Sequence, residues 1–237
     1  LTGAVLSNCN LEDTKLNDAI LFATDLRYTN MVDAELNRAD LRGTCLAGAD
    51  LSGAKMNGVD MCDGVLLRSA AEGGDLTPLV HDEATAGMEK TTLKGADMTG
   101  AKVAANLIVQ TDLTDCILKN ASFKGANLSM SNLTGCDLEG ADFSDANLSG
   151  AIFHGAVFAA TTLDNADLSG ADMIGAMFEN MDFSKVNLDA AHIAKTLGDL
   201  DIEIKEVIIK HGEWVKTNGK EGERADLSKM DLSGESL

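Results

Sequence analysis

The chain has 237 residues, a formal net charge of −19, 45% hydrophobic residues and only 4% aromatic residues. Its richest apolar run, Val103 to Val109, is far shorter than the roughly 20 residues that a membrane-spanning helix needs, so we predict no membrane partner. The acidic balance also argues against direct nucleic-acid binding, because contact with phosphates requires a basic stripe.

A bulky apolar residue occupies every fifth position over the first part of the chain. This period matches neither the 3.6 residues of a helical turn nor the two-residue alternation of a strand, and it therefore indicates a structural repeat. The positions in strict register are Leu1, Leu6, Leu11, Leu16, Leu21, Leu26, Met31, Leu36, Leu41, Leu46, Leu51, Met56, Met61 and Leu66.

An interruption follows, because the next plausible repeat after Leu66 begins at Met88, and this step is not a multiple of five. We expect an excursion loop over residues 67–87. Loops on rigid scaffolds often carry function, which makes its polar and turn residues candidate contacts; these are Pro78, His81, Asp82 and Glu83. The alternative is a tolerated insertion that folds over the apolar exterior near Leu107 and Val109.

A second register runs from Leu93 to Ile193 with the same five-residue step. After it, residues 199–218 lose the period and predict a helix, because Ile204, Ile208 and Val215 share one face. An exposed solenoid end needs a cover, so we expect a capping helix whose contacts are Ile208, His211 and Trp214. A partner-binding helix is the alternative.

The residues that carry the period include Ala39-Asp40-Leu41, Ala146-Asn147-Leu148 and Ala166-Asp167-Leu168. This pattern resembles the pentapeptide-repeat family. The resemblance implies an all-β solenoid, a right-handed quadrilateral parallel β-helix of about nine coils with one excursion loop and a C-terminal α-helical element. The expected parts are coils over 1–66, the loop over 67–87, the main β-helix over 88–195, a capping helix over 196–219 and a returning repeat segment over 220–237.

A coil of four pentapeptides makes a prediction about residues twenty apart, which should stack at the strand spacing of about 4.8 Å. Phe123 should then lie on Phe143, and Phe158 on Phe178. Cys116 and Cys136 should share a column of small core residues. A ladder of outward residues is also expected, formed by Asn127, Asn147, Asp167 and Asn187.

The acidity suggests DNA mimicry, since the resemblance extends to quinolone-resistance and albicidin-resistance proteins that protect DNA gyrase. However, fourteen of the 38 acidic residues stand just before a bulky residue, where the repeat pattern itself supplies Asp. The acidic excess that remains is small. A solvated surface that keeps the protein soluble is therefore the preferred interpretation.

A second surface feature is apolar. Four residues occupy outward positions on two adjacent faces, where the repeat expects polar side chains; they are Ile152, Val157, Ile174 and Met177. Exposed apolar patches usually mark contacts. The helix folding back, a homodimer or a protein partner would each explain this one.

Catalysis has little support, because the four His residues are scattered and form no cluster at metal-ligand spacing. We predict no enzyme activity, no cofactor and no metal. Five cysteines without paired spacing favour reduced thiols and a cytoplasmic setting. The preferred function is a non-enzymatic interaction scaffold within a longer protein, as a monomer or homodimer, since Leu1 already stands in register. The alternative is a gyrase-binding DNA mimic.

Overall fold

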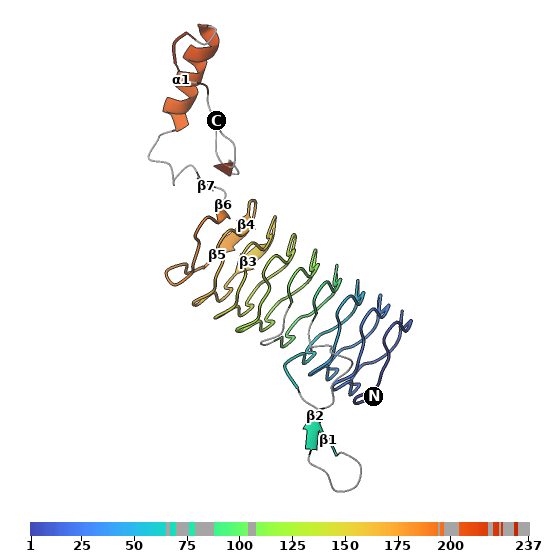
Figure 1. Ribbon diagram of the computed structural model, residues 1–237. Helices are drawn as coiled ribbons and strands as arrows, with labels where there is room; N and C mark the ends of the chain where they lie inside the picture. Colours follow the sequence, from blue (N-terminus) through green and yellow to red (C-terminus); the bar gives the residue numbers. More distant parts are fainter. Residues whose placement is uncertain are drawn as a thin grey trace. The chain divides into compact units, whose positions relative to one another are not determined.

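The computed structural model describes residues 1–64, 67–69, 76–78, 88–103, 108–193, 195–196, 204–217, 220–222, 224 and 230–231 (Figure 1). The described chain divides into two compact units, Leu1–Ala191 and His192–Leu237. The first unit is the repeat solenoid, in which Figure 1 shows one coil stacked on the next from the N-terminus onward.

Each coil takes twenty residues. Parallel bridges join Val5 to Asp25, and the same step recurs along the unit, for example from Asp142 to Thr162. The predicted stacking follows from it: the Phe123 and Phe143 ring centroids lie 5.0 Å apart with an interplanar angle of 5°. Both rings are fully buried, which confirms the twenty-residue register that the period predicts.

The corners are β-turns that recur every five residues. In the first turn, Leu1 to Ala4, the Ala4 N–H donates to the Leu1 carbonyl at 2.9 Å. Gly3, the third residue of this turn, has a φ of 66°. A positive φ at the third residue is the mark of a type II turn, where Gly or Asn is favoured. The repeat imposes this conformation even on Tyr28 and Met130, so the turns are held by the stacked coils as much as by local preference.

The residue before each bulky residue is here called the pairing position. It is often Asp or Asn because these side chains accept hydrogen bonds within the turn that follows. Asp142 Oδ1 accepts a hydrogen bond from the Ser144 N–H at 2.9 Å and another from the Ser144 hydroxyl at 2.6 Å. Asn147 is bonded to Ser149 in the same way. Asp and Asn side chains commonly bond the backbone two residues on, so many of the acids of this chain are turn components.

The residue two before each bulky residue, here called the small position, lies in the core. Several polar side chains at this position donate to a carbonyl of the preceding coil, such as Thr111 Oγ1 to Met88 at 2.7 Å and Cys136 Sγ to Leu113 at 3.0 Å. The neighbouring Cys116 and burial raise the pKa of the Cys136 thiol. These thiols are therefore packed as small core residues.

The solenoid continues across the excursion with a shifted register. Asp50 pairs with Thr92, and Lys55 with Asp97, so the coil resumes at the buried Met88. Within the excursion, β1 (Leu67–Ser69) and β2 (Leu76–Pro78) form an antiparallel pair. The predicted covering of Leu107 lies outside the described residues.

The remaining elements are short strands and one helix. In the solenoid, β3 (Val157–Ala159) pairs in parallel with β5 (Met177–Glu179), and β4 is Asp172–Met173. The second unit contains β6 (His192–Ile193), β7 (Lys195–Thr196), α1 (Ile204–Lys216) and β8 (Met230–Asp231), and β7 pairs in parallel with β8. The helix α1 lies inside the segment for which the sequence predicts one. Among the described helices none is long and apolar enough to cross a membrane.

Candidate interaction surface

The four outward apolar residues, here called the apolar patch, lie on two neighbouring sides of the solenoid. Val157 pairs directly with Met177 across β3 and β5. Met177 is 57% exposed and Ile152 is 37% exposed. The corner between the two sides is formed by His154 with Gly155 and by Ile174 with Gly175, and the glycines have φ values of 66° and 74°. The patch therefore bends around this corner and includes Ile174 in it.

A polar pair crosses the apolar patch. His154 Nε2 lies 3.0 Å from Asp172 Oδ2, and both side chains are partly exposed. Ile152 pairs with Asp172 on the next coil, and Ile174 follows two residues later. The patch thus offers a contacting protein both apolar area and a polar group.

A shallow hollow of about 250 Å³ lies around the next corner, directly after β3 and β5 in the chain. Its lining residues are Ala160, Thr161, Thr162, Leu163, Asp164, Asn180 and Asp182. The hollow and the apolar patch share the same two coils, since Ala159 pairs with Glu179 immediately before it.

The hollow exists because one side of a coil does not pair with the next. Asp142 pairs with Thr162, but among the described residues Thr162 has no bridge to Asp182. The preceding corner also changes: Ala141 N–H donates to the Leu138 carbonyl at 3.0 Å, and the described residues contain no equivalent bond from Thr161 or Met181.

The sequence offers a physical reason for this opening. Met181 occupies a small position that Ala101, Ala121 and Ala141 fill in other coils, where each is buried. Cores of this kind are close-packed, and an oversized side chain displaces the backbone around it. Met181 is only half-buried, as are other inward residues of this last described coil, such as Phe178 and Phe183.

One unpaired backbone donor and two carboxylates line the hollow. In the closed coil, the Phe123 N–H donates to the Asp142 carbonyl at 2.7 Å. Leu163 stands in the equivalent position, is 2% exposed, and its N–H has no acceptor among the described residues. Lys185 Nζ reaches Asp164 Oδ2 only at 3.5 Å. Hydrogen bonds from the backbone and side chain of Ser184 lower the pKa of Asp182, so its carboxylate is charged at neutral pH.

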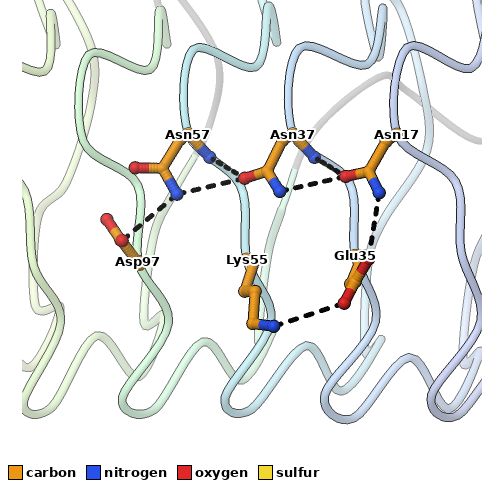
Figure 2. A network of polar contacts seen from close by, with 6 residues as sticks. All are labelled: Asn17, Glu35, Asn37, Lys55, Asn57 and Asp97. Carbon is orange, nitrogen blue, oxygen red and sulfur yellow. Dashed lines mark hydrogen bonds and ion pairs between the residues drawn. The ribbon is translucent and has the colours of Figure 1, made fainter.

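A network of polar side chains links successive coils near the N-terminus (Figure 2). Asn37 donates through its N–H and its Nδ2 to Asn17 Oδ1, at 3.1 and 2.9 Å, and Asn57 repeats both bonds with Asn37. Asn17 and then Lys55 lower the pKa of Glu35. This amide ladder was missed in the sequence, although Asn at twenty-residue spacing was a visible signal for it.

The acids are distributed around the coil. Every side of the described solenoid carries some in its pairing positions: Asp50 and Asp112, Asp97 and Asp137, Asp40 and Asp142, and Asp25 and Asp167. Several are neutralised by short ion pairs, such as Asp40 with Arg42 at 2.7 Å. The Arg42 guanidinium correspondingly lowers the pKa of Asp40. The net charge is thus not gathered on one face.

The other predicted contacts are placed only in part. Pro78 lies in β2, while His81, Asp82 and Glu83 lie outside the described residues. Of the predicted cap, Ile208 lies in α1, and the His211 and Trp214 rings stack at 5.9 Å. The capping role stays a prediction. Within the described part of the chain, no group of three or more His, Cys, Asp or Glu could hold a metal ion.

The comparisons with known proteins agree with this geometry. The pentapeptide-repeat profile matches in eight copies, over residues 1–21, 19–58, 109–140, 116–155 and 151–189. These matches cover more than half of the chain, and the protein therefore belongs to the pentapeptide-repeat family, whose fold is a right-handed β-helix. No curated protein matches the chain.

Solved structures of the family are similar. HetL, a pentapeptide repeat protein involved in heterocyst differentiation regulation from the cyanobacterium Nostoc sp. strain PCC 7120, is 26% identical, with 82% of this chain and 84% of HetL covered and a TM-score of 0.48. A trypsin-treated variant of QnrB1, a plasmid-mediated fluoroquinolone resistance protein, is 15% identical, with 90% of this chain and 96% of that chain covered and a TM-score of 0.50. The second likeness supports the fold alone.

Proposed function

We propose that this protein is a non-enzymatic interaction scaffold, a cytoplasmic solenoid of about nine coils whose last coils bind a protein partner. The helix α1 caps the solenoid in this proposal, and the chain works as a monomer or homodimer within a longer protein. The observation that carries the proposal is the apolar patch, because Ile152 interrupts a column that is otherwise polar, and Val157 and Met177 stand together in the neighbouring column.

The fold explains why a surface is the functional part. The described interior is filled by side chains such as Phe123, Phe143 and Phe153, which are fully buried, so binding has to occur on the outside. Repeat solenoids stack their units into extended surfaces that suit protein recognition.

A binding experiment with matched variants tests the proposal. The intact chain is immobilised, partners are recovered from the source cell and identified, and recovery is repeated with the double variant Ile152→Ser and Met177→Ser. A second double variant, Tyr28→Ser and Met130→Ser, removes apolar side chains elsewhere that are more exposed than those of the patch. We expect loss of partner only with the first pair. Equal recovery by both variants would refute the proposal.

Gyrase binding through DNA mimicry is the second candidate, favoured by the net charge of −19. The distribution of acids over all sides of the coil weighs against it, because a mimic of duplex DNA presents its charge along the face that meets the enzyme. A supercoiling assay decides: purified protein that leaves gyrase activity and its inhibition by quinolones unchanged would exclude this function.

A further inference from the structure

We infer that the hollow beside β3 and β5 is a docking site for a short extended segment of a partner, which presents a basic side chain to Asp164 and Asp182. The inference rests on the proposed scaffold function and specifies the chemistry of the partner.

The backbone of the hollow is the first argument. Leu163 has a nearly buried N–H without an acceptor among the described residues, and a buried donor of this kind normally has a partner. In the closed coils the equivalent N–H donates to a carbonyl of the next coil. A peptide lying along residues 162–164 supplies that carbonyl, as an added strand does at a sheet edge.

The charges of the hollow are the second argument. Asp164 and Asp182 line it together with the amide of Asn180, and the nearby cation, Lys185, reaches Asp164 only at 3.5 Å. A guanidinium or ammonium group forms charge-assisted hydrogen bonds with carboxylates. The volume of about 250 Å³ fits a side chain and a stretch of extended backbone, and a folded element is too large for it.

The spacing of the apolar patch is the third argument. Val157 and Met177 precede Ala160 and Asn180 by three residues, and Ala160 and Asn180 stand at the corner where the chain turns toward the hollow. A partner segment that follows this corner therefore places an apolar residue on Met177 and a basic residue, three positions later, in the hollow. The expected motif is apolar-x-x-Arg or apolar-x-x-Lys.

Titration with two isosteric peptides tests the inference on the full chain. The probes are acetyl-Leu-Gly-Gly-Arg-amide and the same peptide with citrulline, which keeps the shape of arginine and lacks its charge. Binding is followed by the backbone amide signals in ¹⁵N nuclear magnetic resonance spectra. We expect a saturable shift at Leu163 and binding of the arginine peptide about tenfold tighter than that of the citrulline peptide.

Three variants make the result specific. The double variant Asp164→Asn and Asp182→Asn should remove the preference for arginine, whereas Asp142→Asn, in a closed coil, should leave it unchanged. Met181→Ala should close the hollow and abolish the Leu163 shift with both acids still present. Unchanged signals from Phe123 and Phe143 in each variant show that the solenoid remains folded.

The inference is overturned if the two peptides bind equally, if Leu163 does not respond, or if the Asp164→Asn and Asp182→Asn variant keeps the preference. These outcomes are separate from the partner-recovery experiment on the apolar patch. Partner loss with Ile152→Ser and Met177→Ser together with no peptide binding would refute only the docking of a basic segment.

Discussion

Two sides of the solenoid that lie in the same column differ in whether they pair with the following coil. The side at residues 141–145 pairs with both neighbouring coils, while the side at 161–165 pairs with the preceding coil and is open toward 181–185. Both belong to the same repeat and the same register. The difference correlates with the small position, which holds Ala141 in the closed coil and Met181 after the open one.

From this comparison we expect closure of a coil to depend on the volume at the small position. A bulky residue every fifth position sets the period, but the ladder forms only where its neighbour is small enough for the corner to turn. Val59 is also fully buried in this column, so the closed column accommodates valine. An opened side exposes backbone groups, and this turns a structural repeat into a candidate binding surface.

The largest expected loss of stability comes from removing a core side chain of the closed coils. Phe143→Ala removes a fully buried ring that stacks on Phe123 and should lower the free energy of unfolding by about 3–5 kcal/mol. Urea unfolding followed by circular dichroism measures it. The control is Phe22→Ala, which removes a half-exposed ring beside Arg42 and should cost about 1 kcal/mol or less. Equal losses would contradict the filled core.

The next effect converts the closed side into an open one. Ala141→Met places the methionine of the open coil in the closed column and should destabilise the protein by about 1–3 kcal/mol. It should also break the bond from the Phe123 N–H to the Asp142 carbonyl, and hydrogen exchange of that amide should accelerate. Ala141→Val is the control, since Val59 already occupies this column. Slow exchange in the methionine variant would show that another feature opens the coil.

The regular part of the fold could be predicted from the sequence because the bulky residues recur with a strict period. The stacking of Phe123 on Phe143 and the return of the coil at Met88 follow from counting by five and by twenty. The hollow could not be predicted in this way, although Met181 is visible at a small position. Whether a core deforms around an oversized residue depends on how far its neighbours can shift, and periodicity carries no information on that.

Only the part of the candidate site that depends on the repeat register was predicted. The outward places of Ile152 and Met177 follow from the register, whereas the unpaired N–H of Leu163 is a property of the displaced backbone. The turn-forming role of the pairing-position acids was also visible, because Asp142 is followed two residues later by Ser144.

A smaller effect tests that role of the acids. Asp142→Ala removes the acceptor for the Ser144 N–H and hydroxyl and should cost about 1 kcal/mol in the free energy of unfolding. Asp142→Asn keeps the acceptor oxygen, as Asn147 does naturally, and should cost much less. If both variants lose the same amount, the charge of Asp142 rather than its turn bond stabilises the coil.

The smallest change in stability is expected where the open side is closed. Met181→Ala loses the burial of a half-exposed side chain but allows residues 182–184 to pair with 162–164, and these contributions oppose each other. We expect a net change within about 1 kcal/mol. The informative measurement is hydrogen exchange of the Leu163 amide, which should slow because its N–H gains the Asp182 carbonyl as an acceptor. Persistent fast exchange at Leu163 would mean that Met181 does not hold the hollow open, and the link between small-position volume and binding surface would then be wrong.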